Sequence, residues 1–124
     1  MKKQKSNLAF KKAVTIFFVI FAIIIVFALF DYFVHLLSEE YAVPARYFTN
    51  KLIYGTLIGV AVYFFVRKFK LLARVLIFSA VVSVLLQTRY FLEGYSLKFV
   101  LLFLGIHFFI LLIVSWLAFK FVKI

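Results

Sequence analysis

The sequence predicts an all-α protein, a bundle of four membrane-spanning helices with both termini on the cytoplasmic side. The chain of 124 residues is 68% hydrophobic and only 15% charged, whereas a soluble domain is about half apolar and about a quarter charged. Four long apolar runs, at residues 13–37, 48–66, 71–86 and 99–119, are close to the length that crosses a bilayer as a helix. We therefore expect a single membrane domain.

The charges outside these runs predict the orientation of the helices. The N-terminal segment, the connection between the second and third runs, and the C-terminal segment carry eleven basic residues and no acidic one: Lys2, Lys3, Lys5, Lys11, Lys12, Arg67, Lys68, Lys70, Arg74, Lys120 and Lys123. The two other connections carry balanced charges: Arg46, Lys51, Arg89 and Lys98 against Asp31, Glu39, Glu40 and Glu93. Because short loops rich in Lys and Arg stay in the cytoplasm, we expect both termini inside, in the cell membrane.

Charge and apolar length predict the structure of the N-terminal part of the chain. Residues 1–12 are predicted to form a basic cytoplasmic tail that meets anionic lipid headgroups, and residues 13–124 to form the four-pass domain. The run at 13–37 is too long for a cleaved signal peptide and lacks a small-residue cleavage site, so we interpret it as the first spanning helix. Pro44 marks the outer turn that follows.

Small residues predict how the next helices pack. Gly55 and Gly59 form a G-x-x-x-G pair on one face of the run at 48–66, which lets another helix come close. The short connection after this run makes the run at 71–86 its antiparallel neighbour. There, Ser79 and Ser83 share a face and suit tight packing. The run at 99–119 is the cleanest of the four, with His107 as its ionisable residue.

Polar residues near the outer ends of the runs predict a pocket in the outer leaflet. Asp31 and His35 are four residues apart and share a helix face, and His107 lies at a depth similar to that of Asp31. Ionisable residues within a span are candidates for function. The expected pocket contains seven residues: Asp31, His35, Lys51, Tyr54, Gln87, Arg89 and His107.

Two other interpretations of these residues stay open. Asp31 could pair with Lys51 or Arg89 and pin two helices together, with His107 as a hydrogen-bonding residue, and we favour this structural role. Asp31, His35 and His107 also match the ligand set of a non-haem iron site, and two imidazoles could ligate haem. We treat metal and haem as minority possibilities and expect no cofactor.

The same observations limit the classes of function. The chain has no cysteine, which excludes disulfides and thiolate chemistry, and it has no nucleic-acid motif. Ser79 and Ser83 have no acid or histidine at their depth, which argues against hydrolysis. We therefore expect a non-enzymatic subunit that packs with itself, as a homo-oligomer, or with a larger membrane partner. The alternative is a binding or transport protein for an ion, proton, metal or small ligand, which would use the outer pocket.

Overall fold

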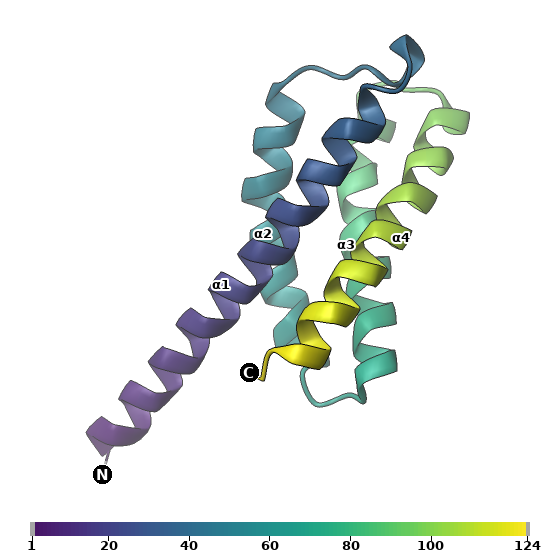
Figure 1. Ribbon diagram of the computed structural model, residues 1–124. Coiled ribbons are helices and arrows are strands. Elements are labelled where there is room, and N and C mark those ends of the chain that lie inside the picture. The colour runs from purple at the N-terminus through teal and green to yellow at the C-terminus, as the bar shows by residue number, and fades with distance from the viewer. Residues whose placement is uncertain (1, 124) are drawn as a thin grey trace.

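The computed structural model describes residues 2–123, and its regular elements are helices throughout this range. The elements are α1 (Lys2–His35), the short 3-10 turn η1 (Glu39–Tyr41), α2 (Arg46–Val66), α3 (Leu71–Leu92) and α4 (Leu97–Phe121). α1 packs on α2, α2 on α3, α3 on α4, and α4 back on α1, so the bundle is closed (Figure 1). The expected all-α class with four helices is confirmed.

The helices differ from the predicted runs mainly at their ends. The basic segment predicted as a tail is helical from Lys2 and continues into α1 without a break, since no glycine or proline interrupts it. This part of α1 projects beyond the other helices (Figure 1). α3 runs to Leu92, six residues past its predicted end, because Gln87 and Tyr90 face the interior of the bundle and are buried there. Gly94, at φ 88°, then ends the helix in a conformation that favours glycine.

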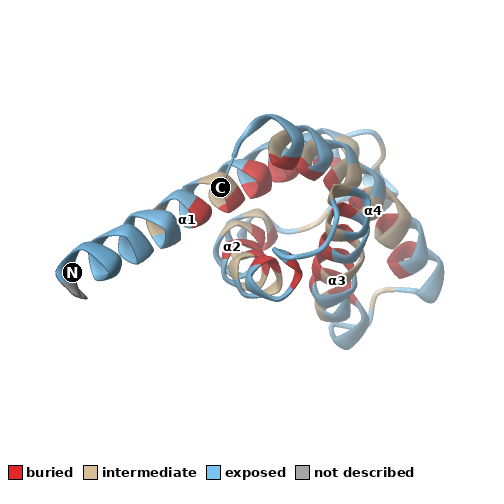
Figure 2. Ribbon diagram, turned by 90° about the horizontal axis from the view of Figure 1, so that it is seen from below, coloured by how far each residue is buried: buried red, intermediate tan, exposed pale blue. Residues whose placement is uncertain are grey.

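The core has two parts with different side chains. The larger part is mostly aliphatic and includes Ile20, Ile24 and Phe27 of α1. The smaller part is mostly aromatic: Tyr47, Tyr90, Phe99, Val100 and Phe103. Seen along the bundle, the buried residues of all four helices face inward (Figure 2). The two parts fill the centre of the bundle along its length.

The small residues singled out in the sequence lie at helix contacts. Gly55 and Gly59 are buried on α2 against α1, where a methyl group added at Gly59 would lie 2.7 Å from Ile20 Cγ2. Ser79 and Ser83 are buried on α3. The Ser79 hydroxyl is 3.2 Å from the hydroxyl of Ser115 on α4, and the Ser83 hydroxyl donates to the Ser79 carbonyl oxygen.

The outer surface of the bundle is apolar. All four α-helices are long and apolar enough to cross a membrane, yet only 22% to 39% of the most apolar stretch of each is buried. Large apolar side chains such as Phe18, Phe65, Leu72 and Phe109 are exposed on the four helices. Exposed apolar surface of this extent is typical of a protein covered by lipid or by a partner. The chain therefore has the features of a small multi-pass membrane protein.

Candidate functional site

Asp31 of α1 lies at the centre of a buried polar cluster that joins three helices. Its Oδ2 accepts a hydrogen bond from Lys51 Nζ of α2, and its Oδ1 is 2.8 Å from His107 Nε2 of α4 and 3.4 Å from His35 Nε2. The side chains of Asp31 and His107 have no exposed surface, and those of His35 and Lys51 have almost none. We call these four residues, Asp31, His35, Lys51 and His107, the Asp31 cluster.

Hydrogen-bond partners fix the proton positions in the two imidazoles. His35 Nδ1 lies 2.5 Å from the carbonyl oxygen of Tyr41, which can only accept, so Nδ1 carries the proton. His35 Nε2 lies 3.4 Å from both Lys51 Nζ and Asp31 Oδ1. His107 Nε2 faces a carboxylate and therefore donates to Asp31. Lys51 and Asp31 carry opposite charges and pair directly in the interior.

Aromatic rings surround the cluster. The His35 ring stacks on Phe103 with centroids 4.2 Å apart, and the edge of His107 meets Phe27 at 5.0 Å. Lys51 Nζ lies 5.0 Å from the ring centre of Tyr90, in a cation–π arrangement. These contacts place the cluster where the aliphatic and aromatic parts of the core meet, out of reach of solvent.

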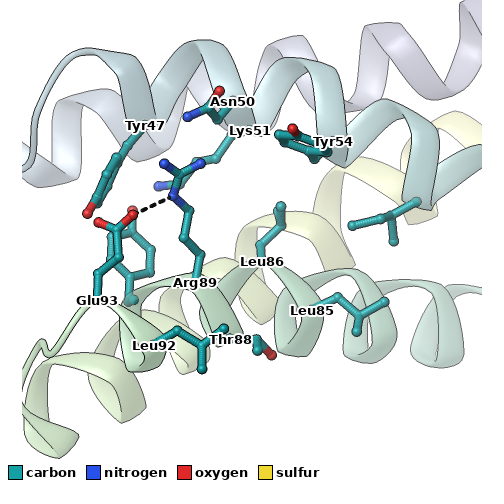
Figure 3. A pocket seen from close by; sticks show the side chains of 12 residues that line it. Tyr47, Asn50, Lys51, Tyr54, Leu85, Leu86, Thr88, Arg89, Leu92 and Glu93 are labelled. Carbon is teal, nitrogen blue, oxygen red and sulfur yellow. Dashed lines mark hydrogen bonds and ion pairs between the residues drawn. The ribbon is translucent and has the colours of Figure 1, made fainter.

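The seven residues of the expected outer pocket fall into separate places. Asp31, His35, Lys51 and His107 come together in the cluster. Gln87 is buried but donates its Nε2 hydrogen to the carbonyl oxygen of Val100, at 2.7 Å. Tyr54 and Arg89 line an open cavity of about 450 Å³ between α2 and α3, and Arg89 pairs there with Glu93 at 3.1 Å (Figure 3). Lys51 lines this cavity as well, so it belongs both to the cavity wall and to the Asp31 cluster.

Two contributors to the site are absent from the sequence-based list. Tyr90 lies three residues after Gln87 on the inner face of α3, and this spacing could have identified it had the helix been extended past residue 86. Tyr41 acts through its backbone carbonyl oxygen. A backbone carbonyl carries no sequence signal, so only the fold reveals this contact.

The cluster also offers donor atoms for a metal ion. One ligand atom from each of Asp31, His35 and His107 lies within 4.8 Å of the other two. A metal held by these atoms would take the proton position of His107 Nε2 and compete with Lys51 for the carboxylate. Haem does not fit, because both Nε2 atoms face the same oxygen of Asp31, which occupies the space that a porphyrin needs.

No protein-family model matches the chain, and neither a curated protein nor a solved structure has significant similarity to it.

Proposed function

We propose that the chain is an integral protein of the cell membrane with both termini in the cytoplasm. We further propose that it is a non-enzymatic subunit that packs with itself or with a larger membrane partner. The distribution of charge along the bundle supports the orientation. The connection between α2 and α3 and the C-terminus lie at one end, with basic residues and no acidic residue (Figure 1). Glu39, Glu40 and Glu93 lie in the connections at the other end. The positive end faces the cytoplasm under the rule for short loops.

Labelling of single cysteines tests this orientation. The natural chain has no cysteine, so each introduced thiol is the only one that a maleimide can modify. The Glu40→Cys variant should react with an impermeant maleimide on intact cells, whereas the Lys68→Cys variant should react only after permeabilisation. The cysteine-free chain is the control. The reverse pattern would contradict the orientation, and equal labelling of both variants on intact cells would contradict insertion.

An apolar groove along α1 and α4 carries the proposal of packing. It has a volume of about 800 Å³ and is lined almost entirely by apolar side chains. Ala22 of α1 and Ala118 of α4 line it, and such small residues let a further helix approach closely. The Asp31 cluster, in contrast, is buried inside the bundle and its charges are paired. This arrangement suits a role in holding helices together.

Native mass spectrometry in nanodiscs, with a matched pair of variants, tests the packing. The natural protein should appear as chain multiples or together with another polypeptide. Ala118→Trp fills the groove and should abolish that species, whereas Ala61→Trp, on an exposed face of α2, should preserve it. A natural protein that appears only as a single chain, or with lipid alone, would contradict the proposal.

Unpaired buried atoms favour a second candidate function, the binding or transport of a proton, ion, metal or small ligand. His107 Nδ1, the Tyr90 hydroxyl and Gln87 Oε1 are buried with no hydrogen-bond partner among residues 2–123. A buried polar atom without a partner costs about 1–3 kcal/mol, which a water or ligand can offset. Elemental analysis of the purified protein tests whether it binds a metal ion. Bound metal that is lost in the His107→Ala variant would support it, and a metal-free natural protein would remove it.

A further inference from the structure

Two small cavities at the end of the bundle that carries the C-terminus share Tyr63 as a lining residue. One has a volume of about 320 Å³ and is lined by Lys12, Tyr63, Arg67 and Lys68. The other has a volume of about 220 Å³ and is lined by Tyr63, Arg74, Phe119, Val122 and Lys123. Tyr63 is 3% exposed and lines both cavities. We call these residues the inner basic site.

The charge of the inner basic site is of one sign. Five of its residues are basic and none is acidic. Within residues 2–123, every carboxylate that forms an ion pair belongs to Asp31 or Glu93. Clefts lined by one sign of charge concentrate ions of the opposite sign. The electrostatics therefore favour an anion here.

The two arginines of the site are held in place without carboxylates. Arg74 lies 5.5 Å from the ring centre of Phe119, and its Nη1 donates to the carbonyl oxygen of Arg67 at 3.4 Å. Arg67 lies 5.5 Å from the ring centre of Phe64. Arg74 Nε is buried and has no partner among the described residues. The guanidinium groups are thus positioned while part of their hydrogen-bonding capacity remains unused.

The start of α3 adds to the positive field at the site. Lys70 is the N-cap residue of α3, and no side chain caps the free N–H groups of the first turn. A helix N-terminus favours anions and disfavours cations, yet Arg74 lies in the second turn of this helix. The dipole of α2 favours positive charge at its C-terminus, which explains the placement of Arg67 and Lys68 there. It does not explain the placement of Lys12 or Arg74. An anion bound at the site would account for all four.

We propose that the inner basic site binds an anionic headgroup with two phosphates, one in each of the two cavities that Tyr63 lines. Arginine and lysine are the residues that recognise phosphate, and basic pockets between helices at the cytoplasmic side hold lipid headgroups. Exposed apolar side chains lie within two residues of the lining residues along the chain, namely Phe65, Leu72 and Phe121. These can contact acyl chains, which favours a lipid as the source over a soluble bisphosphate. The lipid assignment rests on the proposed membrane insertion.

Binding of defined lipids to the purified full chain tests the proposal. The probes are cardiolipin, which carries two phosphates, phosphatidylglycerol, which carries one, and inorganic pyrophosphate as a soluble bisphosphate. Native mass spectrometry should show cardiolipin retained in preference to phosphatidylglycerol. The Arg67→Gln/Arg74→Gln variant should bind cardiolipin about thirtyfold more weakly, the equivalent of about 2 kcal/mol for two charges. The control is Lys3→Gln/Lys5→Gln, which removes the same charge from the exposed start of α1.

Each outcome decides one part of the proposal. Equal retention of the two lipids with no binding of pyrophosphate, or equal loss in the two double variants, would overturn the site. Binding of pyrophosphate that is lost in the arginine variant, without a preference for cardiolipin, would keep the site and identify a soluble ligand. If the arginine variant does not fold, Lys68→Gln in the exposed turn takes its place, with an expected loss of about fivefold. Lipid binding together with reversed cysteine labelling would contradict the proposed orientation and leave the site intact.

Discussion

The close packing of α1 on α2 depends on Gly55 and Gly59. Replacing each of three helical glycines by alanine, one at a time, measures how close this packing is. In Gly59→Ala, the new methyl group would lie 2.7 Å from Ile20 Cγ2, closer than side chains pack, so α1 or Ile20 has to move. In Gly55→Ala, the nearest atom is Ile24 Cγ2 at 3.1 Å, which requires a shift of only a few tenths of an ångström. In Gly105→Ala on α4, the methyl group meets no atom within 4 Å. Gly105→Ala is therefore the matched control.

The expected magnitudes follow from two opposing effects. Alanine is about 1 kcal/mol more favourable than glycine inside a helix, and overpacking a tight contact costs about 1–3 kcal/mol. Gly105→Ala should be neutral or up to about 1 kcal/mol more stable. Gly59→Ala should be less stable than Gly105→Ala by about 1–3 kcal/mol, with Gly55→Ala between them.

Unfolding by SDS in mixed micelles measures these differences. Trp116, the only tryptophan, reports the transition by its fluorescence, and circular dichroism gives a second signal. The Ile20→Ala substitution removes the Cγ2 atom that Gly59→Ala would strike. In that background Gly59→Ala should lose most of its penalty. Equal stability of the Gly59→Ala and Gly105→Ala variants would refute the close approach of α1 and α2.

Three further predictions concern polar contacts and one turn. Asp31→Leu or Lys51→Met alone should destabilise the bundle by about 3–5 kcal/mol because each leaves a buried charge without its partner, whereas the two together should cost far less. Additive losses in the same unfolding assay would rule out that pairing. Ser115→Ala removes the hydroxyl contact with Ser79 and should cost about 0.6 kcal/mol; a loss above about 2 kcal/mol would imply another role. Gly94→Ala should lower the free energy of unfolding by about 1–2 kcal/mol because φ at this residue is positive. An unchanged midpoint of the SDS unfolding transition would argue against that turn.

The sequence predicts the number of helices because apolar length alone determines it. The end of α3 escapes this reasoning, because a hydropathy run stops at Gln87 while the helix continues with its polar side chains turned inward. Depth along the helices places Asp31 and His107 at similar levels, and in the structure they are 2.8 Å apart. Which cation pairs with Asp31 depends on the rotation of α2 and α3 about their axes. The sequence leaves Lys51 and Arg89 as equal candidates, and the fold selects Lys51.

The outer pocket illustrates the same limit. Residues at one depth are predicted to share one pocket, but depth says nothing of the direction in which a side chain points. Tyr54 and Arg89 line the cavity between α2 and α3 (Figure 3). His35 and His107 are instead buried against Asp31 inside the bundle. One predicted pocket is therefore a sealed cluster beside an open cavity. The sequence shows the inner basic site only as scattered charge, since its residues come from all four helices and from the segments that follow α2 and α4.

Under the proposed membrane insertion, the position of Asp31 has a consequence for the order in which the helices can enter the bilayer. Asp31 would be costly in lipid on α1 alone, but Lys51 follows only twenty residues later and can neutralise it within the α1–α2 hairpin. His107 follows seventy-six residues later and joins only when α4 arrives. The first hairpin can thus insert with Asp31 already paired to Lys51, and the last helix then closes the bundle around this pair.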